Sequence, residues 1–118
     1  MEEKERHRPR VHSLNLVSFT KFLPGLIPEV VGMGNTIDLG EAGLQMSTNV
    51  ELHKGDVLRL EMVLKGEIVK ADARIAHVEE VKLYHVGLHF ENMEPQDLVK
   101  VRLYLAEHGF RDRTTEGI

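Results

Sequence analysis

The chain has 118 residues, 42% of them hydrophobic, and no cysteine, which suits one domain whose core needs neither a disulfide nor a metal. Its net charge of −4 argues against a general nucleic-acid binder, although a small anionic ligand needs only a local cluster of positive charge. Residues 1–10 are almost wholly charged and no run of about 18 apolar residues occurs, so we expect no secretory signal, no membrane span and a cytoplasmic protein.

The first part of the chain predicts a leader and two strands. Residues 1–12 form a flexible basic leader, because a segment of this composition has little apolar surface to bury. Residues 14–22 alternate weakly, with Leu14, Leu16 and Phe22 on one face, and predict a strand. The segments that follow are a loop at Pro24-Gly25 and Pro28, a strand at 30–37, a turn at 38–43 and an extended run at 44–46.

Strict two-residue alternation marks the middle of the chain. The apolar positions are Leu58, Leu60, Met62 and Leu64, then Val69, Ala71, Ala73 and Ile75, then Val86, Leu88 and Phe90. Turns are predicted at Lys54-Gly55-Asp56 and at Lys65-Gly66. Alternation gives each strand one buried face and one wet face, and several short strands joined by tight turns predict a small antiparallel barrel or sandwich.

The spacing becomes helical after Pro95, which suits the first position of a helix. Gly109 is predicted to end this helix, and residues 111–118 to form a polar tail. The apolar residues fall in two stripes, Leu98, Val101 and Leu105 on one side and Val99, Leu103, Ala106 and Phe110 on the other. A helix packed on one neighbour needs only one stripe, so the second either packs under a loop or meets another chain.

Two short clusters carry the functional signal. Arg6 and Arg10 form an R-x-x-x-R spacing in the leader, and residues 38–43 form a D-x-G-x-x-G turn. Taken alone, an arginine cluster near a terminus is usually solvated, and a glycine-rich turn between strands is usually only a turn.

Together and in this order, the two clusters resemble the signature of the PilZ family, R-x-x-x-R followed some tens of residues later by (D/N)-x-S-x-x-G. The resemblance covers nearly the whole chain, including the strand after Gly55, the strand at 86–90 and the closing helix. It implies a mainly β fold, a six-stranded antiparallel barrel with a C-terminal α-helix, in agreement with the periodicity. The barrel and helix would then span residues 13–110, between the leader at 1–12 and the tail at 111–118.

The resemblance also implies a ligand, the bacterial second messenger cyclic di-GMP, bound by Arg6, Arg10, Asp38, Gly40 and Gly43. Arginine can bond phosphate oxygens with its planar fork, stack on a purine, or meet the O6/N7 edge of guanine. A carboxylate such as that of Asp38 offers acceptors for the paired N1–H and N2–H donors of guanine, which adenine lacks. Gly43 supplies either a positive φ or room for a close backbone approach.

One motif position departs from the family pattern, because Gly40 stands where the family has serine. A hydroxyl that could bond the ligand is therefore missing. A lost hydrogen bond is worth roughly 0.5–1.5 kcal/mol, or about 1.5–3 kcal/mol at a charged phosphate. The expected result is binding weakened about ten- to a hundredfold rather than abolished.

The favoured function is a non-enzymatic receptor, in which cyclic di-GMP orders the leader against the 38–43 turn and the signal passes to an unknown downstream protein. The alternative, favoured by Gly40, is a degenerate PilZ domain that acts as a protein-interaction adaptor without nucleotide binding. A third possibility is binding of single-stranded nucleic acid. The net charge of −4 and an aromatic content of only 5% argue against it. A homodimer through the second helical stripe or the neighbouring strand edges is the simplest protein contact.

We expect neither a cofactor nor a metal site, and no catalysis. His85 and His89 share one face of a strand, but four residues of strand place them roughly 13 Å apart. That separation is too large for both to bind one ion, and no other His/Asp spacing matches a metal site. The sequence shows no Ser/His/Asp constellation that the predicted barrel would bring together.

Overall fold

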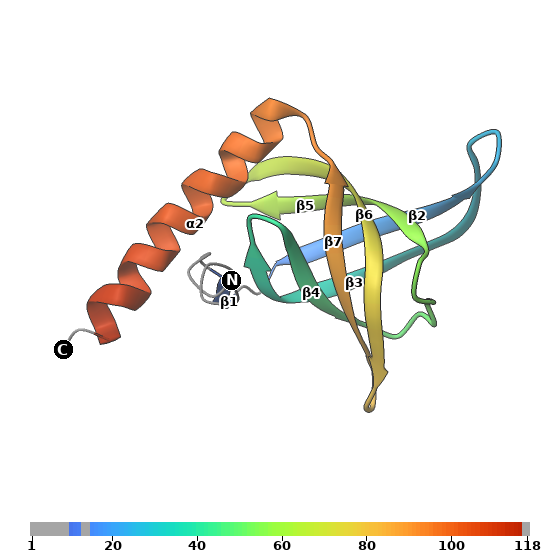
Figure 1. Cartoon of the computed structure of the whole chain (residues 1–118), viewed down its shortest axis with the longest axis horizontal. Coiled ribbons are helices and arrows are strands. Elements are labelled where there is room, and N and C mark those ends of the chain that lie inside the picture. The colour runs from blue at the N-terminus through green and yellow to red at the C-terminus, as the bar shows by residue number, and fades with distance from the viewer. Residues whose placement is uncertain (1–9, 13–14, 117–118) are drawn as a thin grey trace, which may run out of the picture.

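The computed structural model describes residues 10–12 and 15–116, with the backbone alone for 109–116. The predicted fold is confirmed: these residues form an antiparallel β-barrel with one long helix at its side (Figure 1). The elements in chain order are β1 (Arg10–His12), β2 (Leu16–Leu23), β3 (Ile27–Gly40), β4 (Gly43–Thr48), β5 (Val57–Leu64), β6 (Glu67–Glu80), β7 (Tyr84–Asn92) and α2 (Pro95–Glu116).

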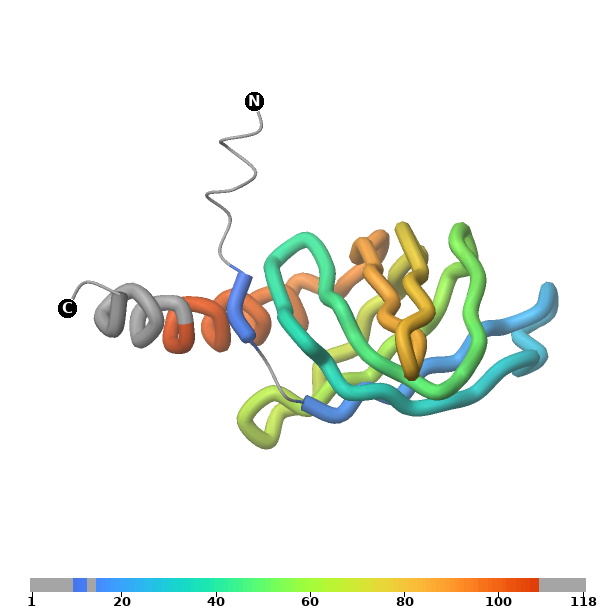
Figure 2. The backbone as a smooth tube through the Cα atoms, turned by 90° about the horizontal axis from the view of Figure 1, so that it is seen from below, coloured from blue at the N-terminus to red at the C-terminus, as the bar shows by residue number. Residues whose placement is uncertain are grey.

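The barrel is closed by six strands in the order β3-β2-β5-β6-β7-β4, with β4 pairing back onto β3. Strand β3 makes closure possible because its 14 residues are long enough to pair with three strands. It pairs with β2 first, then with β4, and its last three residues also pair with β1. Closure removes the unpaired strand edges that an open sheet would leave. Strand β1 is an addition to this barrel, and Figure 2 shows it between the barrel and the helix, which it contacts.

The core is built from the alternating strand residues that the sequence singled out. Leu58, Leu60, Met62 and Leu64 on β5 are all buried, and so are Val69, Ala71, Ala73 and Ile75 on β6. Burying one Leu or Val side chain stabilises a fold by about 1.5–3 kcal/mol. The predicted turn between these strands is also confirmed, because Lys65 and Gly66 have φ angles of 52° and 79°. Two positive φ values give the tight reversal whose twist matches that of a hairpin.

The predicted inward face of the first strand was wrong. In β2 the buried residues are Val17 and Phe19, whereas Leu16 is exposed and Phe22 is half-buried. The register explains this, since Val17 and Phe19 lie opposite the buried Met62 and Leu60 of β5. A bulge between Lys21 and Phe22 then shifts the register against β3, so the weak alternation of the sequence does not run in one phase. Leu14 lies outside the described residues.

Three predicted boundaries were also wrong. Residues 10–12 pair with β3 instead of belonging to an unpaired leader, and Pro28 lies in β3 instead of a loop. The turn predicted at 38–43 shrinks to Glu41 and Ala42, because Asp38 and Leu39 pair with Gln45 and Leu44 across the β3–β4 hairpin. The ends of a tight hairpin loop therefore belong to the strands.

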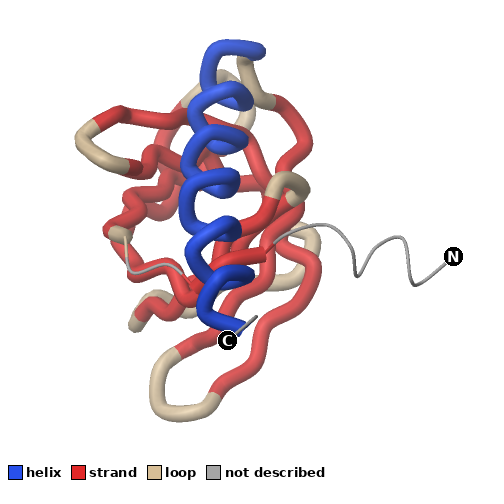
Figure 3. Tube along the Cα trace, turned by 90° about the vertical axis from the view of Figure 1, so that its left-hand side faces the viewer, coloured by secondary structure: helices blue, strands red, loops and turns tan. Residues whose placement is uncertain are grey.

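The helix α2 packs across one side of the barrel with its first apolar stripe, as predicted (Figure 3). Val101 and Leu105 are buried, together with Tyr104. Val99 and Leu103 of the second stripe are exposed, whereas nothing is described of the Phe110 side chain. The helix continues past Gly109 to Glu116, which corrects the predicted end: an interior glycine costs a helix only about 1 kcal/mol relative to alanine and no proline follows.

Candidate ligand site at the β1–β3–β4 corner

Strand β1 brings the two predicted clusters together. Its three residues pair with the last residues of β3, so that Arg10 lies opposite Gly40 and His12 lies opposite Asp38. The Arg10 side chain reaches along the sheet to Asp38, where Nε donates a hydrogen bond of 3.1 Å to Oδ1 and Nη2 forms an ion pair with the same oxygen. The sequence predicted both residues for one site, and the structure places them in direct contact.

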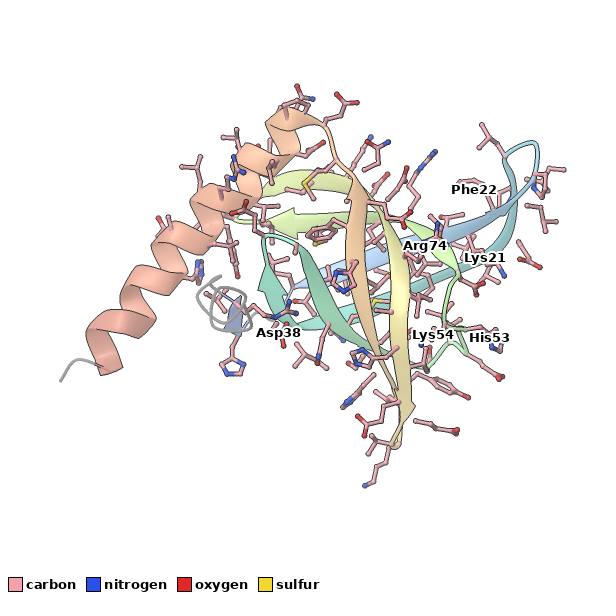
Figure 4. The ribbon with its side chains drawn as sticks, viewed as in Figure 1. Lys21, Phe22, Asp38, His53, Lys54 and Arg74 are labelled. Carbon is pink, nitrogen blue, oxygen red and sulfur yellow. The ribbon has the colours of Figure 1, made fainter. Side chains whose placement is uncertain are left out.

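This ion pair lies at the surface and is therefore easy to exchange. The side chains of Arg10 and Asp38 are 45% and 23% exposed, and Figure 4 shows Asp38 on the side of the barrel where β1 lies. Exposed ion pairs contribute only about 0–1 kcal/mol. Both Arg10 contacts go to Oδ1, so Oδ2 has no donor among the described residues. A ligand with phosphate groups and hydrogen-bond donors could bind Arg10 and Asp38 in place of their ion pair. The exchange would cost little free energy.

The two motif glycines lie beside this pair. Gly43 opens β4 opposite His89 of β7, and a Cβ atom on Gly43 would lie 2.0 Å from the carbonyl oxygen of Leu88. Its φ is not positive, so of the two predicted reasons for glycine the close backbone approach is the correct one. Gly40 ends β3, is buried, and also avoids a positive φ. Arg6, the remaining predicted residue, lies outside the described residues.

A cavity of about 130 Å³ adjoins this corner and was not predicted from the sequence. It is bounded by Arg10, the outer faces of β4, β6 and β7, and the rings of His77 and His89. The usable signal was the alternation of β7, which sends His89 to the same outer face as Gly87. The histidine spacing in the sequence argued against a shared metal ion and did not predict this cavity. Among residues 10–12 and 15–116, no three His, Cys, Asp or Glu side chains form a metal-ligating group.

Arg74 supplies a second cation beside His89, its partner across the β6–β7 ladder. Its Nη2 donates a hydrogen bond of 3.2 Å to Glu91, and Nη1 donates one of 2.9 Å to the carbonyl oxygen of Gly55. The hydrogen bond and charge of Glu91 raise the pKa of Arg74 above its ordinary value. The positive charge of Arg74 is therefore balanced by Glu91, as that of Arg10 is balanced by Asp38.

The motif turn is also connected to the helix, which the sequence did not predict. Nη2 of Arg102 on α2 donates a 2.9 Å hydrogen bond to Glu41, in the bend between β3 and β4. A second link joins Asn15, just before β2, to the hydroxyl of Tyr104 at 3.1 Å. The helix thus contacts the site through the bend and through β1. No helix in the described part of the chain is long and apolar enough to cross a bilayer.

Known proteins share the fold of this chain. A family model described as the PilZ domain matches residues 5–107. No curated protein sequence matches the chain. Among solved structures, the PilZ domain of YcgR from Escherichia coli with c-di-GMP superposes with a TM-score of 0.71 at 14% identity, over 95% of this chain and 97% of that one.

Two longer proteins share the fold. The inhibitor of motility MotI/DgrA of Bacillus subtilis superposes with a TM-score of 0.77 at 14% identity, over 92% of this chain and 53% of that one. The complex of YcgR from Escherichia coli with c-di-GMP superposes with a TM-score of 0.68 at 15% identity, over 96% of this chain and 50% of that one. The chain thus spans about half the length of these two proteins.

Proposed function

Because this chain belongs to the PilZ domain family, we propose that it is a non-enzymatic cytoplasmic receptor for cyclic di-GMP. The single observation that carries the proposal is the contact between Arg10 and Asp38, which joins the two sequence clusters at one surface corner. The PilZ domain of YcgR and YcgR itself, which share this fold, have been solved with c-di-GMP, and this supports the choice of ligand. The proposed binding residues are Arg6, Arg10, Asp38, Gly40 and Gly43, with no metal or cofactor.

Binding proceeds by exchange of partners. Arg10 leaves Asp38 and bonds phosphate oxygens or the guanine O6/N7 edge, contacts that are charge-assisted or bidentate. The freed carboxylate of Asp38 then accepts from the N1–H and N2–H of guanine. The lost ion pair costs about 0–1 kcal/mol, which is less than a charge-assisted hydrogen bond of about 1.5–3 kcal/mol returns.

The signal leaves the site through the helix. Glu41 lies between Asp38 and Gly43 in the motif, and its hydrogen bond to Arg102 ties the bend to α2. A ligand that orders the leader and displaces the bend changes this contact and those of β1 with α2. The surface offered to a downstream protein then differs between the free and bound states.

Isothermal titration of the purified chain with cyclic di-GMP, and with cyclic di-AMP as the matched ligand, tests the proposal. We expect saturable binding of the guanine ligand and much weaker binding of the adenine ligand, because Asp38 finds no N1–H and N2–H pair on adenine. Absence of heat with either ligand, from a protein that melts cooperatively, would leave the adaptor function as the correct one.

Gly40 is the observation that favours the adaptor, and restoring the family serine tests its effect. We predict that Gly40→Ser tightens binding about tenfold, because a hydroxyl beside the phosphates restores a hydrogen bond worth about 1.5 kcal/mol. Gly40 does not have a positive φ, so serine introduces no left-handed strain. Calorimetry gives the affinity and thermal melting the stability. Unchanged or weaker binding at an unchanged melting temperature would show that this chain binds without the serine.

The exposed stripe of α2 is the proposed contact with a second copy of the chain. Leu103 lines a cavity of about 310 Å³ with the end of the β5–β6 hairpin. The surrounding charges are balanced, since Lys65 pairs with Glu107 and Lys100 lies 3.5 Å from Glu67. Two such surfaces can therefore meet around a twofold axis without the repulsion that a net charge of −4 would otherwise bring.

We predict a homodimer at micromolar concentration that Leu103→Glu converts to monomer with little change in melting temperature, because Leu103 is 66% exposed. Sedimentation equilibrium measures the mass. Leu26→Glu is the matched control, since Leu26 is 68% exposed in the β2–β3 hairpin, away from the helix. A monomeric wild-type protein, or equal effects of the two variants, would show that the helical stripe is not the interface.

A further inference from the structure

The His77 ring lies over Gly87 on the neighbouring strand. A Cβ atom on Gly87 would be 2.2 Å from Cε1, 2.6 Å from Nδ1 and 3.0 Å from Nε2 of His77. Three ring atoms around one point mean that the imidazole occupies the space where any other residue would carry its side chain. His77 nevertheless remains exposed. Glycine at position 87 therefore leaves room for the imidazole beside β7, while His77 stays open to solvent.

His77 and His89 border the same cavity as Arg10. The cross-strand pairs His77–Gly87 and Gly43–His89 place the two imidazoles on the outer face of β6 and β7, next to the start of β4. Gln45 completes the polar lining from β4. At about 130 Å³ the cavity is smaller than the roughly 300–1,000 Å³ of a complete ligand pocket, so it can hold one part of a dinucleotide.

The charged groups around the imidazoles come from each neighbouring strand. The cations are Arg10 of β1 and Arg74 of β6, which are paired with Asp38 and Glu91 respectively. On β7 the titratable side chains of this face besides His89 and Glu91 include His85, and β1 adds His12, which lies opposite Asp38. The acids on the outer face of β6 are Glu79, opposite His85, and Asp72, which pairs with Arg59. Strand β4 contributes no charge, since its outward residues there are Gln45 and Ser47. Both carboxylates already pair with an arginine, and neither forms an ion pair with His77 or His89 among the described residues. An anionic ligand is therefore a suitable partner for the two imidazoles.

We propose that His77 and His89 bind the ligand in their protonated form, so that the affinity for cyclic di-GMP rises as the pH falls. This inference rests on the proposed function and concerns the same site. Histidine is the side chain whose charge ordinarily changes between about pH 5 and pH 8. An imidazole ring can stack on a base, and a protonated one also attracts the two phosphates. Binding of the anion favours the protonated imidazole, so the gain is present at low pH and is lost as the pH rises through this range.

Calorimetric titration with cyclic di-GMP at about pH 6 and about pH 8, at constant ionic strength, measures the effect. One charge–phosphate contact at a surface is worth about a fivefold change in affinity, so we expect binding at least fivefold tighter at the lower pH. Titration in two buffers of different ionisation enthalpy should also show net uptake of protons on binding. The variant carrying both His77→Gln and His89→Gln should lose most of the pH dependence and of the proton uptake.

His53→Gln is the matched control, because His53 lies between β4 and β5 on the far side of the barrel from Asp38 (Figure 4). It should keep the pH dependence in full. Equal affinity at the two pH values, or an unaltered pH dependence in the double variant, would overturn the inference and leave the proposed function intact. Absence of binding at both pH values, from a folded protein, would overturn the proposed function and the inference with it.

Discussion

Arg10→Ala is expected to weaken cyclic di-GMP binding at least tenfold, a loss of about 1.4 kcal/mol, while the barrel stays folded. Arg10 is the described arginine of the motif, and it is the residue of β1 that lines the cavity beside the proposed site. Alanine removes the charge-assisted contact and the possibility of stacking on a guanine. The fold should tolerate the change because the side chain is 45% exposed and its ion pair with Asp38 is worth at most about 1 kcal/mol.

Arg59→Ala is the matched control for this variant. Arg59 also forms an exposed ion pair with an aspartate, Asp72 at 3.3 Å, and lies on β5, away from the motif. Both variants should melt close to the wild type, and only Arg10→Ala should lose affinity in calorimetry. Equal affinities for all three proteins would remove Arg10 from the site. The sequence motif predicts the same loss for Arg6→Ala.

Local sequence signals were sufficient for the hairpin of β5 and β6. Strand β5 alternates without interruption, and its buried residues Leu58, Leu60 and Met62 face Ala73, Ala71 and Val69 of β6 across the ladder. The turn between them needs only two residues that tolerate positive φ. Pattern and turn agree there, so burial, register and loop could all be predicted from adjacent residues.

Long-range pairing was not predictable in the same way. Strand β1 has three residues and no pattern of its own, and it exists because β3 extends far enough to offer it Asp38 to Gly40 as partners. The inward face of β2 is likewise fixed by β5, whose residues lie some forty positions later in the sequence. The two clusters of the site could be linked by their family resemblance, whereas their contact depends on this strand pairing.

The histidines show a different limit. Alternation predicts that His85 and His89 share one face of β7, and their separation of roughly 13 Å argues against a shared metal ion. The proposal adds His77, which lies opposite Gly87 because the register shifts between Ile75 and His77 on β6. A bulge changes which side chains meet, and nothing in the local composition of β6 marks its position.

Gly43→Ala should destabilise the barrel by about 4 kcal/mol, at the upper end of the range for single substitutions, and lower the melting temperature by about 15 °C. The added Cβ would lie 2.0 Å from the carbonyl oxygen and 3.0 Å from the carbonyl carbon of Leu88. Both are backbone atoms of β7 and neither can turn aside, so the β4–β7 ladder must separate at its first pair. This ladder is part of the closed barrel and lies next to the proposed ligand site, so binding should be lost together with stability.

Gly25→Ala separates this contact from the general cost of replacing glycine. Gly25 has a positive φ of 85° in the β2–β3 hairpin, and a Cβ there would meet nothing within 4 Å. Alanine at such a position costs about 1–2 kcal/mol through its backbone preference alone. Thermal melting of both variants should therefore show a much larger loss for Gly43→Ala, and calorimetry should show unchanged cyclic di-GMP affinity for Gly25→Ala. Equal losses of stability would mean that β4 and β7 can move apart at little cost and that the close approach does not explain the motif glycine.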